Sequence, residues 1–106
     1  MGKITDLSDS EFRDFLGKNN LVMVDFFADW CGPCHMLSPV IEKLSEELEN
    51  VKFAKMDVDQ NRETPGKFGI LSIPTLLVFK EGKLVDRLTG VLPKRSIEDR
   101  LRKFLD

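Results

Sequence analysis

The stretch VDFFADWCGPC, residues 24–34, decides the fold of this chain. It continues an apolar run that begins at Leu21 and is broken only by Asp25, as expected of a central strand covered on both faces. From Cys34 onward the apolar positions follow a helical period. The two cysteines, Cys31 and Cys34, therefore lie where a buried strand passes into a long helix.

These two cysteines are interpreted as a reactive pair. Thiols at positions i and i+3 lie one turn apart on the same helix face, so their sulfurs can form a disulfide and open it again. A disulfide that braces a fold more usually joins distant segments, because closing a longer loop removes more entropy from the unfolded chain. The first helical turn also gathers free N–H groups and the positive end of the helix dipole, which favour a thiolate. Cys31 is therefore the candidate nucleophile, held ionised and exposed, and Cys34 the candidate resolving thiol.

Other readings of the same motif remain as alternatives, the simplest being two buried structural thiols. Cys31-x-x-Cys34-His35 matches a c-type haem attachment motif, although strands crowd both of its sides and a haem needs a pocket. The same three residues are zinc ligand types, but a structural site would lack its fourth ligand. As the general base of a cysteine protease His35 is poorly placed, because its side chain points about 100° away from that of Cys34. We expect no bound cofactor and no metal, and an exposed His35 that tunes the thiolate mildly.

Asp25 is the only ionisable residue in the apolar run. Burial of an unpaired carboxylate raises its pKa, and such a carboxyl near two sulfurs can exchange protons with Cys34. Lys55, in a strand expected at 51–58, shares one side of that strand with two apolar residues and can point inward as a partial counter-charge. The alternatives are a satisfied edge position for Asp25 and a solvated side chain for Lys55.

The rest of the chain predicts alternating strands and helices that end in a hairpin and a helix. A capping box at 8–11 opens the first helix with Gly17 as its stop, Glu81-Gly82 form a tight turn, and Pro93 opens the last helix. The expected helices lie at 8–17, from Cys31 to Asn50, just before Gly69 and after Pro93, and the expected strands include 21–28, 51–58, 76–79 and 84–89. The order β-α-β-α-β-α-β-β-α predicts an α/β fold, in which a mixed sheet of parallel strands and an antiparallel hairpin has helices on both faces.

Length and composition restrict the remaining possibilities. A chain of 106 residues without a linker or repeat predicts a single domain, 1–106. A formal net charge of −2 without a basic tract disfavours nucleic-acid binding. No apolar run reaches the roughly 20 residues that span a bilayer, and the first residues lack the apolar region of a signal peptide. We therefore expect a monomer in the cytoplasm that does not bind a membrane.

Several of these segments together resemble the thioredoxin family. Residues 24–34 are similar to its active-site strand and turn, Ile73-Pro74-Thr75 to its cis-proline segment, residues 79–82 to its hairpin, and Gly90 to the glycine after its last strand. The resemblance covers essentially the whole chain. It implies the thioredoxin fold and a thiol–disulfide oxidoreductase of the electron-carrier type.

The resemblance also implies roles for residues of this chain. Cys31 would attack a disulfide in a target protein, and Cys34 would resolve the mixed disulfide with help from Asp25, whose pKa Lys55 would adjust. Pro74, in cis, would face the cysteines. The apolar docking surface would comprise Trp30, Gly32, Pro33, Ile73, Gly90 and Val91. The partners would be disulfide-containing target proteins and a thioredoxin reductase, linked to NADPH or to ferredoxin.

Two departures from the family pattern affect the redox potential and the preference for partners, and not the reaction. His35 stands where Lys or Arg is usual, which reduces the positive charge near the thiolate, and Phe27 stands where many members have Trp. The leading function is a protein disulfide reductase. The alternatives are a disulfide oxidant or isomerase, since direction depends on the potential of the couple, and a binding subunit whose thiols are idle.

Overall fold

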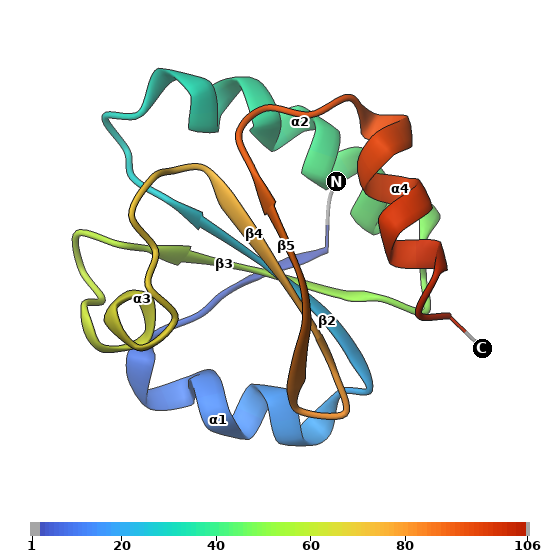
Figure 1. The fold of residues 1–106 in the computed structure, drawn as a ribbon, viewed down its shortest axis with the longest axis horizontal. Coiled ribbons are helices and arrows are strands. Elements are labelled where there is room, and N and C mark those ends of the chain that lie inside the picture. The colour runs from blue at the N-terminus through green and yellow to red at the C-terminus, as the bar shows by residue number, and fades with distance from the viewer. Residues whose placement is uncertain (1–2, 106) are drawn as a thin grey trace.

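Five strands form one mixed sheet in the order β1-β3-β2-β4-β5, with four helices around it (Figure 1). The structure is a computed structural model that describes residues 3–105. The strands are β1 (Ile4–Asp6), β2 (Leu21–Phe27), β3 (Lys52–Asp57), β4 (Thr75–Lys80) and β5 (Lys83–Thr89). The helices are α1 (Asp9–Lys18), α2 (Gly32–Glu47), α3 (Glu63–Lys67) and α4 (Lys94–Arg102).

The strand pairing changes from parallel to antiparallel at the central strand, β2. β1 and β2 both run parallel to β3, whereas β4 is antiparallel to β2 and forms a hairpin with β5. The hairpin turns at Glu81 and Gly82, which both have positive φ angles, of 51° and 82°. The element order and the mixed sheet confirm the fold predicted from the sequence.

The central strand β2 divides the interior into two cores. Its residues alternate between the faces, as the two-residue period of a strand requires. Leu21 and Met23 pack in the core that α2 and α4 cover, and Val22, Val24 and Phe26 pack in the core that α1 covers. All five side chains are buried. The apolar run of the sequence is therefore explained by helices on both faces of the strand.

Two predicted helix bounds are wrong. Gly17 does not stop the first helix, which continues to Lys18, because the side chain of Asn19 caps it by donating a hydrogen bond of 2.9 Å to the carbonyl of Phe15. The second helix begins at Gly32, directly after Cys31 as expected, but it ends at Glu47, before the expected Asn50. This start leaves Cys31 as the residue that caps the helix.

No helix within residues 3–105 is both long enough and apolar enough to span a membrane.

Candidate active site

Cys31 and Cys34 are joined by a disulfide at the start of α2, with their Cα atoms 5.3 Å apart. The strand β2 ends at Phe27, and the chain turns so that the N–H of Cys31 donates to the carbonyl of Ala28. Cys31 is the N-cap of α2, and Pro33 lies in the first turn, where its missing N–H is of no consequence. The sequence thus places the pair where it was predicted, between the central strand and the long helix.

The N-terminus of α2 supplies positive potential to the Cys31 sulfur. The backbone N–H of Cys34 donates to Cys31 Sγ at 3.2 Å. The sulfur thereby takes the position of the oxygen in an ordinary helix cap, in line with the dipole of a 16-residue helix. Both the donated N–H and the helix dipole favour negative charge at this position.

The expectation that the Cys31 sulfur is exposed is wrong for the oxidised protein. The residue is only 4% exposed, and Cys34 is 2% exposed, because both pack with Ala28 against Val58 and Ile73. The two cysteines differ in what lies beside them. Cys31 lines an open groove, whereas Cys34 is not among the residues that line it.

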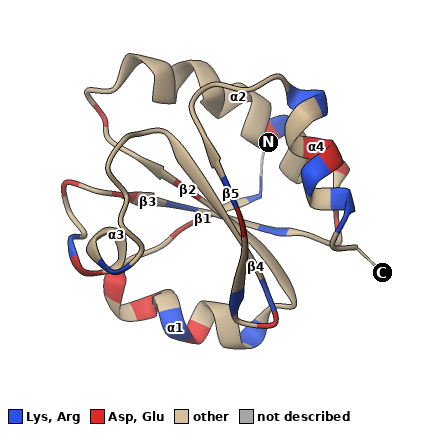
Figure 2. Ribbon diagram, in the orientation of Figure 1, with Lys and Arg blue, Asp and Glu red and all other residues tan. Residues whose placement is uncertain are grey.

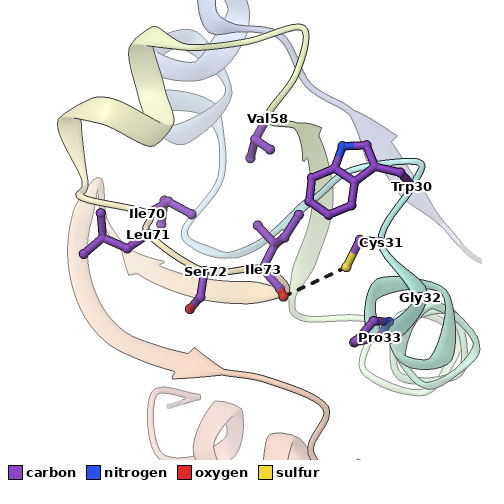
Figure 3. A pocket seen from close by; sticks show the side chains of 9 residues that line it. All are labelled: Trp30, Cys31, Gly32, Pro33, Val58, Ile70, Leu71, Ser72 and Ile73. Carbon is purple, nitrogen blue, oxygen red and sulfur yellow. Dashed lines mark hydrogen bonds between the residues drawn. The ribbon is translucent and has the colours of Figure 1, made fainter.

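The groove beside Cys31 is apolar and has a volume of about 480 Å³ (Figure 3). Trp30 stands on one side, 71% exposed, with its Nε1–H donating to Asp59 at 2.7 Å. Leu71 stands on the other side and is 97% exposed. The segment between α3 and β4, which forms this second side, carries no charged residue (Figure 2). The groove is lined by Trp30, Cys31, Gly32, Pro33, Val58, Ile70, Leu71, Ser72 and Ile73.

Sequence reasoning found only part of this groove. Trp30, Gly32, Pro33 and Ile73 were predicted for the docking surface and line it, whereas Val58 and the run 70–72 were missed. The available signal was an apolar pair, Ile70-Leu71, outside any strand or helix period. Pro74, Gly90 and Val91 were also predicted and are not among the lining residues.

The Ile73–Pro74 peptide bond is cis, as the resemblance implied. The carbonyl oxygen of Ile73 lies 3.9 Å from Cys31 Sγ (Figure 3). Gly90, with a φ of 88°, donates its N–H to the carbonyl of Pro74 at 2.9 Å. Val91 follows it and is 42% exposed. The cis-proline loop therefore packs against the disulfide on one side and is held by the residue after β5 on the other.

Asp25 is buried in the central strand β2, six residues before Cys31. Asp25 is 5% exposed, and its Oδ1 has no hydrogen-bond partner among the described residues. Burial raises the pKa of this carboxyl from 3.8 to about 7, while the charge of Lys55 acts in the lowering direction. A carboxyl that titrates near neutral pH can take up and release protons under the conditions of the reaction.

Lys55 lies beside Asp25 but pairs elsewhere. The two residues are in register between β2 and β3. The Lys55 side chain is 43% exposed, and its Nζ lies 3.8 Å from Oδ1 of Asp6 and 5.5 Å from the centre of the Phe27 ring. Lys55 therefore lies next to Asp25 in the sheet, but its ammonium forms its ion pair with Asp6 and not with Asp25.

His35 is exposed, as expected, and one of its ring nitrogens lies 2.6 Å from the carbonyl oxygen of Asp29. The imidazole thus bridges the first turn of α2 to the loop before Trp30. Within residues 3–105, no group of three or more His, Cys, Asp or Glu side chains is placed to hold a metal ion.

Comparison with known proteins identifies the family. The thioredoxin family model matches residues 3–103. A thioredoxin from Listeria monocytogenes is 44% identical over 103 residues, which cover 96% of this chain and 99% of that protein. A mutant thioredoxin from Halobacterium salinarum superposes with a TM-score of 0.93 at 33% identity, over 98% of this chain and 92% of the other. A structure concerning thiol resolution in a yeast mitochondrial 1-Cys peroxiredoxin via the glutathione and thioredoxin systems gives 0.88 at 31% identity, over 94% of each chain.

Thioredoxins are thiol–disulfide oxidoreductases that use their own redox-active disulfide and need no bound cofactor, and this chain has that disulfide between Cys31 and Cys34. The chain therefore belongs to the thioredoxin family, and it is a protein disulfide reductase.

Proposed function

We propose that Cys31 is the nucleophile and Cys34 the resolving thiol of this reductase. The Cys31 thiolate attacks one sulfur of a target disulfide, which forms a mixed disulfide and releases one target thiolate. Cys34 loses its proton and attacks the Cys31 sulfur, which releases the second target thiolate and restores the Cys31–Cys34 disulfide. Two electrons pass to the target, whose two sulfurs each take up a proton. The helix-capping position of Cys31 is the observation that carries this assignment.

Asp25 is proposed as the base that takes the proton of Cys34 in the second step. A pKa of about 7 supports this role, because a carboxyl of that pKa is a stronger base than an ordinary one and is still partly ionised at neutral pH. Lys55 is proposed to tune the pKa of Asp25 through its charge.

The groove beside Cys31 is proposed to bind an extended segment of the target protein. Trp30, Gly32, Pro33 and Ile73 would contact this segment, and Pro74, Gly90 and Val91 would support or extend the surface. The apolar lining and the high exposure of Trp30 and Leu71 support this role. Such a groove accepts segments of varied sequence, which suits a general reductase.

We also propose the setting in which this reductase works. Residues 1–106 would act as a single domain and a monomer in the cytoplasm, recharged by a thioredoxin reductase linked to NADPH or to ferredoxin. The yeast structure, which concerns a 1-Cys peroxiredoxin, makes peroxiredoxins one class of target to try first.

Insulin reduction tests the proposed function. With dithiothreitol as the electron source, we expect this protein at micromolar concentration to speed the precipitation of insulin chains well above the uncatalysed rate. A rate at the background of dithiothreitol alone would identify a binding subunit instead. The equilibrium of the dithiol with glutathione then separates reductant from oxidant, because a reductase of cytoplasmic targets must hold a more negative potential than an oxidase.

Alkylation tests the difference between the two cysteines. In the reduced protein at neutral pH, iodoacetamide is expected to label Cys31 at least about tenfold faster than Cys34, because only Cys31 caps the helix and lines the groove. Mass spectrometry of tryptic peptides after short exposures measures both rates. Equal labelling would contradict the assigned roles.

A further inference from the structure

Three charged residues form a row across neighbouring strands. Asp6 in β1 is in register with Lys55 in β3, and Lys55 is in register with Asp25 in β2. Residues two before each of them, Ile4, Phe53 and Met23, all contribute to the core beneath α2 and α4. Because side chains two apart on a strand lie on the same face, the three charged side chains share that face too. Adjacent strands are about 4.8 Å apart, so each aspartate lies next to Lys55 in the sheet.

The ammonium of Lys55 is paired at one end of this row only. Its Nζ lies 3.8 Å from Asp6 Oδ1 and over the ring of Phe27. Asp25, at the other end, keeps an Oδ1 with no hydrogen-bond partner among residues 3–105. The backbone supports this asymmetry, since the N–H of Leu7 donates to the carbonyl of Lys55 at 2.9 Å and fixes the end of β1 against β3.

The other charged groups near Lys55 are acidic. Glu11 from α1, Asp29 from the loop after β2 and Asp57 from β3 line the same hollow as Asp6 and Lys55. Lys55 is the only cation among the described residues that line it. On the α2 side lie the two cysteines, which carry no charge while they form the disulfide, and His35, which is bound to the Asp29 carbonyl. Among residues 3–105, no second cation lines this hollow that could replace Lys55.

We propose that Asp6 is a positioning residue, which draws the Lys55 ammonium outward and leaves the Asp25 carboxyl without a close counter-charge. The inference rests on the proposed role of Asp25 as the base for Cys34. An ammonium that moved inward would stabilise the Asp25 carboxylate and make it a weaker base. Asp6 therefore keeps Asp25 basic enough to take a proton from a thiol near neutral pH.

The test is the titration of Asp25 in the oxidised protein, where the cysteines cannot titrate. The carboxyl carbon signal of Asp25, followed by NMR against pH, is expected to shift its midpoint downward by about 0.2–0.7 pH unit in Asp6→Asn, as weak exposed ion pairs allow. Asp14→Asn is the matched control. It removes a carboxylate from another exposed lysine pair, 2.9 Å from Lys18, and should leave the midpoint unchanged.

A second background separates positioning from simple charge. Lys55→Met is expected to raise the midpoint of Asp25, because the lysine charge lowers its pKa. In that background Asp6→Asn should move the midpoint much less, since there is no ammonium left to redirect. An equal downward shift in both backgrounds would mean that Asp6 acts directly through space, and no shift in either would mean that it does not act at all. Both results overturn the proposal.

The rate of mixed-disulfide resolution gives the functional readout. Its pH profile is expected to move down with the Asp25 midpoint in Asp6→Asn. If Asp25 proves to have no part in resolution, the profile stays in place while the NMR midpoint still moves. Failure of the proposed function and failure of this inference therefore give different results.

Discussion

Cys31→Ser is expected to lower the rate of disulfide reduction by at least about a thousandfold, to the uncatalysed background. The sulfur that caps α2 and lines the groove is then gone. Cys34 cannot replace it, because it is 2% exposed and does not reach the groove. The measurement is insulin reduction with dithiothreitol, using the variant and the parent protein at equal concentration.

Cys34→Ser is the matched variant, because it removes one sulfur of the same pair and leaves the nucleophile. It is expected to be slow in turnover as well, but to accumulate a covalent complex with a disulfide target in a single round. The complex is visible on a non-reducing gel and disappears with excess dithiothreitol. Accumulation in Cys31→Ser and not in Cys34→Ser would reverse the two roles.

The fold could be predicted from the sequence because its strongest signals are local. The run 21–28 has the composition of a strand covered on both faces, and the cysteines stand before a clear helical period. Each signal depends on neighbouring residues only. The structure places β2 at the centre of the sheet, with α2 beginning directly after Cys31.

The groove was only half predicted because its second side has no periodicity. Val58 and the run 70–72 lie in connections between elements, where no repeat of apolar positions reveals which side chains point outward. Leu71 in particular is an apolar residue that is 97% exposed, and composition alone would assign it to a core. Leu71 lies in the connection between α3 and β4, where no local pattern of apolar positions reveals that its side chain is exposed.

The ion pair between Lys55 and Asp6 could not be predicted from the sequence, for a related reason. The two-residue period correctly placed its side chain on the face of Asp25. The register between β1 and β3, which brings Asp6 beside it, depends on how distant segments pair and not on the sequence near either residue. The burial of Cys31 likewise follows from Val58 and Ile73, which come from other parts of the chain.

The effect of Asp25→Ala on the free energy of unfolding is expected to be more favourable at high pH than at low pH. The carboxyl has a pKa of about 7 in the folded protein and 3.8 ordinarily, so the unfolded chain ionises first. The parent protein therefore has its full stability below about pH 4 and loses stability as the pH rises through about 7. The difference of about three pKa units corresponds to about 4 kcal/mol, an upper figure for a group this deeply buried.

Urea unfolding of both oxidised proteins at pH 4 and pH 8.5 measures this effect. The free energy of unfolding of the variant minus that of the parent should increase by up to about 4 kcal/mol between the two pH values. The cavity left by alanine costs the same at both, so it cancels in the comparison. Asp25→Asn, which keeps the shape of the side chain, should show the same pH dependence. A difference that does not change with pH would mean that Asp25 titrates normally.

The same variant should lose the proton acceptor for Cys34. Resolution of the mixed disulfide at pH 7 is expected to slow by about a hundredfold, because a positioned base contributes at least that much. Formation of the mixed disulfide should stay within about threefold of the parent, since Cys31 keeps its helix cap. At alkaline pH hydroxide can deprotonate the thiol, so the two rates of resolution should converge. Stopped-flow release of the second target thiol measures this step, and equal rates from pH 6 to pH 9 would exclude Asp25 as the base.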